Sequence, residues 1–212
     1  VRVCSTFTFL VLAFPPLDLW PLAFVALVPW LDTIRNRHFS EKKVFFTSVF
    51  LGALYYIFFH HIYLVSAPFP WLGISPPVVW SIVIGLLISL GLLHGLGWGF
   101  YAFTARKLIN KRSRLTPFLL ATFWVFIELI LAQLNWGIGL SLGYTIPPSS
   151  IFGQWASVGG VWIISFFIVF LNWLLVFQFN DTKPIRSGAH YGLFFTALSI
   201  WIVGGMLLGG WL

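Results

Sequence analysis

Charged side chains are scarce in this 212-residue sequence, because only 8% of the residues are Asp, Glu, Lys or Arg whereas 59% are hydrophobic. A soluble domain of this length needs far more polar surface. The composition therefore excludes a soluble globular protein and indicates that the lipid bilayer is the solvent. Cysteine is scarce too: Cys4 is the only one in the sequence, which excludes an internal disulfide and a multi-cysteine metal site.

What the sequence has instead is a series of apolar runs, several of about 20 residues, the length that a membrane-spanning helix needs. They lack the polar alternation of barrel strands, and hydrocarbon requires every backbone group to have an internal partner. We therefore predict an all-α integral membrane protein, a single polytopic domain over residues 1–212 with about seven transmembrane helices. The predicted spans are Val3–Phe14, Trp20–Leu31, Val44–Ser66, Val78–Ala105, Leu115–Asn135, Trp155–Phe179 and Tyr191–Leu212. The first two are short and form a helical hairpin around Pro15, Pro16 and Asp18.

The cationic residues are distributed on one side of this arrangement. All 12 lie at the amino end or in every second connection: Arg2, Arg35, Arg37, Lys42, Lys43, Arg106, Lys107, Lys111, Arg112, Arg114, Lys183 and Arg186. The positive-inside rule then predicts a cytoplasmic N-terminus and an outward C-terminus. This topology accounts for the net charge of +7, so we expect no nucleic-acid partner, while binding of anionic lipid by the basic loops stays an alternative.

One carboxylate, Glu128, lies in the middle of an apolar span. A charge near the bilayer centre costs at least about 2.5 kcal/mol. We therefore expect Glu128 to face the interior of the bundle, a wet cavity or a partner. A hydrogen bond between helices and a functional role are both consistent with this placement.

Three histidines also lie within the predicted spans, His60, His61 and His94. Adjacent helical residues point about 100° apart, so His60 and His61 are poorly placed to share one ion. Neither a carboxylate nor a cysteine is spaced with them on the same helices. Hydrogen bonding at the membrane interface or between helices is the favoured role, and we expect neither a metal nor another cofactor.

The segment from Gly139 to Gly143 matches the G-x-S-x-G pattern of a nucleophile elbow, with Ser141 at its centre. An elbow needs a strand before the serine and a helix after it, whereas this segment is an outer loop between two spans. No partner for Ser141 is visible in the sequence. An intramembrane serine hydrolase that pairs Ser141 with a histidine from another helix is a minor alternative.

Glycines spaced by four residues occur in two of the predicted spans, at Gly91, Gly95 and Gly99 and at Gly205 and Gly209. Small residues at this spacing let membrane helices approach closely. We interpret both series as packing surfaces.

Several short motifs, taken in order, resemble the membrane domain of bacterial apolipoprotein N-acyltransferases. The matching segments are Phe14-Pro-Pro-Leu-Asp-Leu-Trp-Pro21, Trp124-Val-Phe-Ile-Glu128, Leu142-Gly-Tyr144, Gly159-Gly-Val161 and Asn172. One departure concerns the loop before Leu142, where many members have F-P-W immediately upstream and this chain has Trp136 about three residues further back. The resemblance implies a multi-pass protein of the bacterial inner membrane and nominates Glu128, Trp136 and Tyr144 as residues of a lipid cavity.

The same resemblance implies partners and a reaction. In the family a phospholipid supplies an acyl chain to the amino-terminal diacylglyceryl-cysteine of an apolipoprotein, through a nitrilase-like domain that uses cysteine, glutamate and lysine. We see no such domain before Leu212, and Cys4 is predicted on the opposite side of the membrane. The expectation is thus a membrane-domain-only member or a fragment that has no catalytic residues and is inactive alone. A separate nitrilase-like domain is a candidate partner. A non-enzymatic binding protein or transporter of an amphiphile is the main alternative.

Overall fold

The computed structural model describes residues 2–109, 115–134, 140–179 and 187–209, and every regular element in them is helical. This confirms the predicted all-α class. The elements are α1 (Arg2–Ala13), η1 (Trp20–Leu22), α2 (Ala23–Ala26), α3 (Val28–Arg35), α4 (Glu41–Phe59), α5 (Ile62–Ser66), η2 (Pro70–Leu72), α6 (Pro76–Ile109), α7 (Thr116–Leu134), η3 (Leu142–Thr145), η4 (Gly153–Trp155), α8 (Ala156–Phe179) and α9 (Ser187–Gly209).

Four helical segments in the described residues are long and apolar enough to cross a membrane. They are Glu41–Ser66, Pro76–Ile109, Thr116–Leu134 and Gly153–Gln178, and two shorter apolar helices cover Arg2–Ala13 and Phe195–Gly209. The chain is therefore built from membrane-type helices close to the predicted ranges. The number of spans and the side on which each terminus lies stay predictions.

The second arm of the amino-terminal hairpin is divided where we expected one continuous span. Helix α2 ends at Ala26 and α3 begins at Val28, followed directly by Pro29, which has no N–H to donate to a helix. A buried side chain from α8 satisfies backbone groups at this break: Asn172 accepts a hydrogen bond from the Leu27 amide (3.0 Å) and donates one to the Ala23 carbonyl (2.9 Å). The break is thus held in place by a helix about 145 residues away in sequence.

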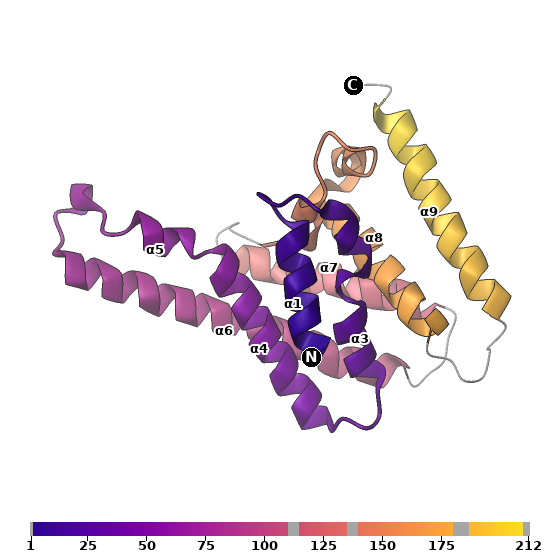
Figure 1. The fold of residues 1–212 in the computed structure, drawn as a ribbon, viewed down its shortest axis with the longest axis horizontal. Coiled ribbons are helices and arrows are strands. Elements are labelled where there is room, and N and C mark those ends of the chain that lie inside the picture. Colours follow the sequence, from indigo (N-terminus) through magenta and orange to yellow (C-terminus); the bar gives the residue numbers. More distant parts are fainter. Residues whose placement is uncertain (1, 110–114, 135–139, 180–186, 210–212) are drawn as a thin grey trace.

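Helices α4 and α6 pack side by side, and α5 with the first part of α6 forms the long arm at the left of Figure 1. Gly95 is at their contact, because a Cβ atom there would lie only 2.4 Å from the Val49 carbonyl oxygen. Gly91 and Gly99 approach side chains of α4 in the same way, which agrees with their predicted packing role. The span predicted over Val44–Ser66 is interrupted at His60 and His61, between α4 and α5.

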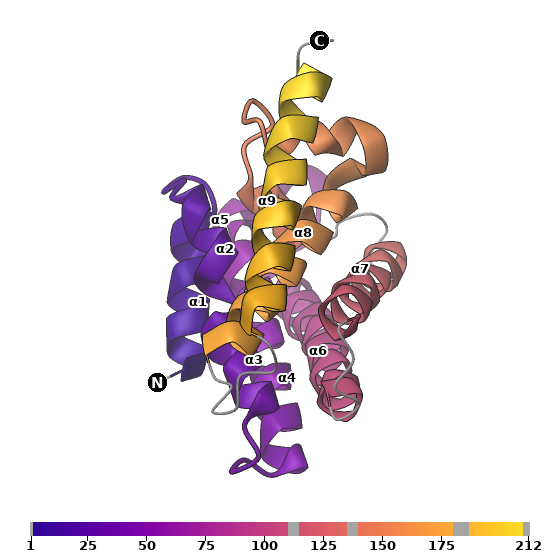
Figure 2. The ribbon, with the colours of Figure 1, turned by 90° about the vertical axis from the view of Figure 1, so that its right-hand side faces the viewer.

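Helix α8 is central to the other half of the molecule. It packs against α2 and α3 on one side and α7 on the other, with α9 in front of it in Figure 2. The packing of α9 depends on Gly205, where a Cβ atom would lie 2.0 Å from the Ile151 carbonyl oxygen. In Figure 1, α6 and α7 cross behind α1 and α3 at a steep angle.

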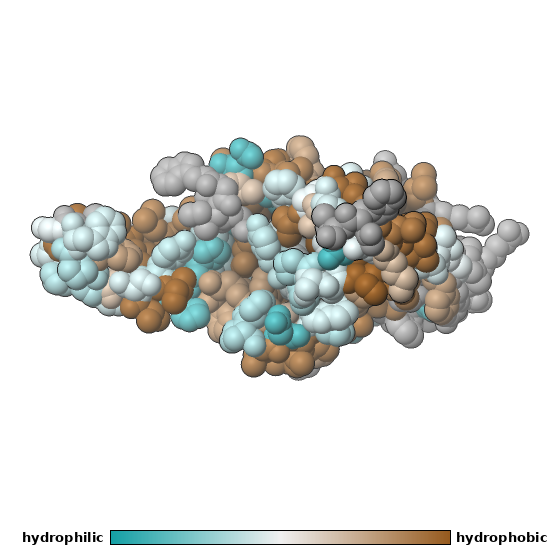
Figure 3. Space-filling model, turned by 90° about the horizontal axis from the view of Figure 1, so that it is seen from above, coloured by the Kyte–Doolittle hydropathy of each residue, from teal (hydrophilic) through white to brown (hydrophobic). Residues whose placement is uncertain are grey.

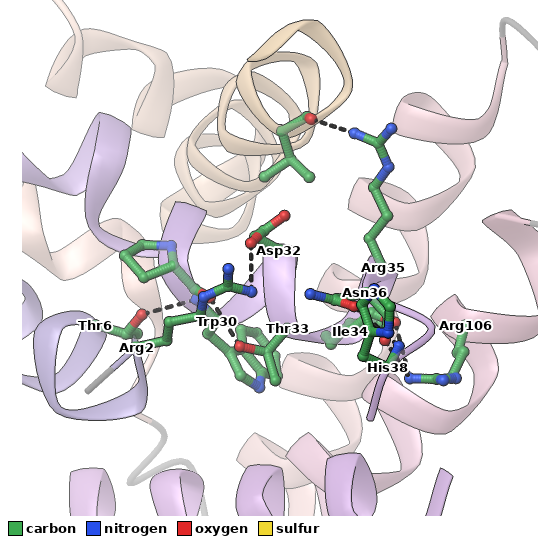
Figure 4. A network of polar contacts seen from close by, with 12 residues as sticks. Arg2, Thr6, Trp30, Asp32, Thr33, Ile34, Arg35, Asn36, His38 and Arg106 are labelled. Carbon is green, nitrogen blue, oxygen red and sulfur yellow. Dashed lines mark hydrogen bonds and ion pairs between the residues drawn. The ribbon is translucent and has the colours of Figure 1, made fainter. Parts of the chain in front are cut away.

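Three arginines from different helices gather at one end of the bundle, which we call the arginine end (Arg2, Arg35 and Arg106; Figure 4). Arg2 pairs with Asp32 at 2.6 Å, and Arg35 donates to the Val176 carbonyl of α8 at 2.7 Å. These contacts bring together cationic residues that lie far apart in sequence. Three of the cationic residues that the sequence assigns to one side therefore lie at the same end of the fold, and the side of the membrane on which that end lies stays a prediction.

Arg106 has a different environment from the other two, because it is buried. Its guanidinium donates to the carbonyls of Ile34, in the last turn of α3, and of Asn36 and Phe39, in the connection to α4. Arg106 is only 5% exposed, and its Nε has no hydrogen-bond partner among the described residues. Arg106 therefore ties a non-helical connection to α6.

Candidate functional site

Glu128 lies on α7 and points into the protein, with 7% of its surface exposed. Its Oε1 accepts hydrogen bonds from the Trp124 indole N–H (2.7 Å) and the Leu142 amide (2.9 Å). Its Oε2 accepts one from the Ser141 hydroxyl (2.7 Å). Trp124 is one helical turn earlier on α7, so the W-x-x-x-E spacing places the indole beside the carboxylate. The carboxylate, which would be unfavourable in hydrocarbon, is thus surrounded by hydrogen-bond donors rather than by lipid.

The loop that supplies two of these donors is also bonded to α8. Ser141 and Ser165 share a hydrogen bond of 2.7 Å between their hydroxyl oxygens, and the Gly143 amide donates to the Ser165 hydroxyl at 2.8 Å. We name the segment Leu140–Thr145 the loop end of the bundle. No partner for Ser141 was visible in the sequence, and the structure supplies two, Glu128 and Ser165.

Two glycine positions allow the loop end to approach α8 so closely. A Cβ atom on Gly143 would lie 2.2 Å from the Val161 carbonyl oxygen, closer than any side chain permits. The helix itself is kinked at Gly159 and Gly160, and Gly160 has a φ of +65°, a value that favours glycine. The Gly159-Gly160-Val161 motif therefore shapes the surface on which Leu142-Gly143-Tyr144 rests.

A cavity of about 40 Å³ lies between α6, α7, α8 and the loop end. It has room for a few water molecules. The residues that line it come from all four segments: His94, Trp98, Trp124, Ile127, Glu128, Leu131, Ala132, Leu140, Ser141, Tyr144, Val161 and Trp162. Tyr144 both lines the cavity and has 54% of its surface exposed, so it connects the cavity to the outside.

Of the three nominated residues, the structure brings Glu128 and Tyr144 to this cavity, whereas Trp136 lies outside the described residues. Sequence reasoning missed Ser165, whose only signal is a hydroxyl within an apolar run. It also missed Trp98 and Trp162, which look like ordinary interfacial or core tryptophans until α6 and α8 are placed together.

The histidines are part of a ring stack. Tyr56 on α4 stacks against His60 at 3.9 Å between ring centroids and against His94 of α6 at 4.2 Å. This ring stack was not foreseen, since we expected hydrogen bonds at the interface or between helices. The Nδ1 atoms of His60 and His94 bond instead to the carbonyls four residues earlier, those of Tyr56 and Leu90. His94 also lines the cavity, whereas His61 is exposed.

The arrangement around Ser141 suits an anchor better than a nucleophile. A serine hydrolase needs backbone N–H groups that are free to stabilise an oxyanion. Here the Leu142 and Gly143 amides donate to Glu128 and Ser165, and the Ser141 hydroxyl is bonded to the same two side chains. These hydrogen bonds fix the loop to two helices.

Comparison with known proteins gives the same picture as the motifs. Residues 8–174 match the family described as "Apolipoprotein N-acyltransferase N-terminal domain". The chain is similar to the apolipoprotein N-acyltransferase of Haemophilus influenzae, with 28% identity over 92% of this chain and 35% of the relative. It is also similar to apolipoprotein N-acyltransferase 2 of Leptospira interrogans, with 31% identity over 80% of this chain and 27% of the relative.

A third relative, the apolipoprotein N-acyltransferase of Synechocystis, is 30% identical over 70% of this chain and 28% of its own length. The chain thus spans about a third of the length of the curated relatives that it matches. The match covers α7, the loop end and most of α8, and therefore all the residues that line the cavity. This chain belongs to the apolipoprotein N-acyltransferase family, of which it matches the N-terminal membrane domain.

Proposed function

We propose that this chain is a membrane platform for lipoprotein maturation, which binds phospholipid and a diacylated apolipoprotein at its loop end. The observation that carries the proposal is the cavity of Glu128, Ser141 and Tyr144, built by helices and a loop within the matched family segment. The relatives are named for N-acylation of an apolipoprotein, and both the donor and the acceptor of such a reaction are amphiphiles.

The size of the cavity limits what enters it. At about 40 Å³ it is far smaller than the ~300–1,000 Å³ of ordinary ligand pockets, so it has no room for an acyl chain. Apolar surface is available outside, because Phe126, Ile130 and Leu134 of α7 are exposed. In our proposal the acyl chains lie against such surfaces and only a polar group reaches past Tyr144.

We further propose that the loop end faces away from the cytoplasm in a bacterial inner membrane. Support comes from the arginine end, which the positive-inside rule assigns to the cytoplasm. Figure 3 shows the molecule from above, where weakly polar and apolar residues predominate and strongly hydrophilic ones cover small areas. Such a surface suits the boundary between membrane and water.

The proposal assigns acyl transfer to groups beyond these 212 residues. A thioester route needs an activated thiolate beside the donor ester. The serine at the site is held by Glu128 and Ser165, and the remaining cavity residues supply no thiol. A nitrilase-like domain would then act on substrates that this platform presents.

The test uses the purified chain in lipid nanodiscs with a fluorescent phospholipid donor and a diacylated lipopeptide. We expect the lipopeptide to bind, and acyl transfer to occur only after a nitrilase-like domain from a relative is added. Failure to bind the lipopeptide above the level of empty nanodiscs would contradict the platform. Transfer by the chain alone that is lost in Ser141→Ala would instead establish a serine acyltransferase.

A further inference from the structure

The cavity at the loop end is lined by one carboxylate, Glu128, and by no lysine or arginine among the described residues. The groups that donate hydrogen bonds to the Glu128 carboxylate are neutral: an indole, a hydroxyl and a backbone amide. Donors of this kind solvate a carboxylate but leave its charge in place. The cavity is therefore suited to a cation and repels phosphate or carboxylate groups.

Aromatic rings add to this preference. Trp98, Trp124, Tyr144 and Trp162 all line the cavity. The face of an aromatic ring attracts a cation, most strongly for tryptophan and in places shielded from water. A buried carboxylate together with four aromatic side chains is a combination that recognises organic ammonium groups.

We propose that this cavity binds a primary ammonium group at the end of an amphiphile. A primary ammonium offers three donors, and the cavity offers the oxygens of Glu128 and Ser141 as acceptors. The volume of about 40 Å³ fits a group of this size and excludes the rest of a lipid. Tyr144, half exposed at the same cavity, provides the route by which the group enters.

This inference rests on the proposed platform, since it names the chemistry that the platform recognises. Two sources could supply the ammonium group. One is the ethanolamine headgroup of a phospholipid, and the other is the free amino terminus of a diacylated lipoprotein. Both join a primary ammonium to acyl chains that remain in the membrane.

The test is calorimetric titration of the purified chain in maltoside detergent. The probes are short-chain phosphatidylethanolamine, phosphatidylcholine and phosphatidylglycerol, together with a diacylated lipopeptide whose amino terminus is either free or acetylated. We expect about tenfold tighter binding of phosphatidylethanolamine than of the other two phospholipids, or of the lipopeptide with a free amino terminus than of its acetylated form. A preference confined to the phospholipids identifies the headgroup as the source, and one confined to the lipopeptide identifies the peptide amino terminus.

Two variants test the residues. Glu128→Gln removes the charge but retains an oxygen for Trp124 and Leu142, and we expect it to abolish the preference. Glu41→Gln, the same change at an exposed position on α4, should retain it. Because Glu128→Gln could also impair folding, Tyr144→Leu provides a second measurement at a half-exposed residue. We expect it to reduce the preference about threefold.

The outcomes separate this inference from the platform on which it rests. If none of the lipids and lipopeptides binds, the platform itself is wrong. If all bind but ammonium and non-ammonium probes bind equally, the platform stands and the ammonium site is wrong. A preference that survives unchanged in folded Glu128→Gln also overturns the inference.

Discussion

The two ends of the helical bundle are held by buried groups of opposite charge. At the loop end, the Glu128 carboxylate accepts hydrogen bonds from Leu142 and Ser141. At the arginine end, the Arg106 guanidinium donates to the carbonyls of Ile34, in the last turn of α3, and of Asn36, which follows that helix. In each case a charged side chain on a long helix satisfies polar groups that helical hydrogen bonding leaves unpaired.

The ends differ in how their polar contacts are arranged. The arginine end uses three arginines that act on three different helices or connections. The loop end depends on one carboxylate and two serines, and it borders a cavity. Several independent contacts indicate a part of the molecule whose role is to hold the helices together. A single polar centre beside a cavity indicates a part that is open to a ligand, which is where we place function.

The largest expected effect is a difference in cysteine labelling, which reports the side of the membrane on which each end of the bundle lies. In a Cys4→Ser background, cysteine replaces His38 near the arginine end or Ser149 beyond the loop end, both exposed positions. A membrane-impermeant maleimide added to spheroplasts should label position 149 fully and position 38 only after permeabilisation. Labelling of position 38 but not 149 would reverse the topology.

Glu128→Leu should have the largest effect on stability. The substitution leaves the buried donors of Trp124 and Leu142 without an acceptor, at a cost of about 1–3 kcal/mol each, so we expect a loss of about 3 kcal/mol in the free energy of unfolding. Glu128→Gln should lose about 1 kcal/mol, because one oxygen still serves both donors. The midpoint of denaturation in mixed micelles measures both, with Glu41→Leu as the exposed control. A Glu128→Leu variant as stable as this control would show that the loop end is not held by the carboxylate.

Gly143→Ala should be the next most damaging change, because it tests the close approach of the loop end to α8. The new methyl group would meet the Val161 carbonyl oxygen at 2.2 Å, so the backbone has to move, at a cost of about 1–3 kcal/mol. Gly85→Ala is the matched control, since a Cβ atom on Gly85 meets nothing within 4 Å. That variant should be neutral or more stable by up to about 1 kcal/mol. Equal stabilities for the two variants would mean that the loop end is not packed against α8 as described.

Much of this fold follows from local properties of the sequence. The apolar runs predicted the long helices within a few residues. The spacing of Gly91, Gly95 and Gly99 predicted a close helix contact, for which the structure supplies the partner, α4. The inward orientation of Glu128 followed from the cost of a charge in hydrocarbon. Each of these conclusions depends on one segment and its solvent, which is why sequence was sufficient.

The remaining features depend on contacts between segments that sequence does not place. Ser141 meets Ser165 of α8, a helix that is kinked at Gly160, and Asn172 reaches Leu27 from a helix far along the chain. The stack of Tyr56 between His60 and His94 likewise requires the register of α4 against α6. A hydroxyl or an amide in an apolar run signals that a partner exists, but not which partner it is.

The smallest effect should come from the arginine end, with Arg106→Met. The variant loses donors to three carbonyls, but these carbonyls lie in a connection at the end of the bundle, where water can replace part of what is lost. It also removes the buried Nε, which has no hydrogen-bond partner among the described residues, and so removes the desolvation cost of that group. Methionine retains the length of the apolar stem. We therefore expect a loss of only about 1 kcal/mol in the free energy of unfolding, against no change for Lys107→Met at the neighbouring exposed position. A loss as large as that of Glu128→Leu, measured in the same micelles, would show that the arginine end is no more redundant than the loop end.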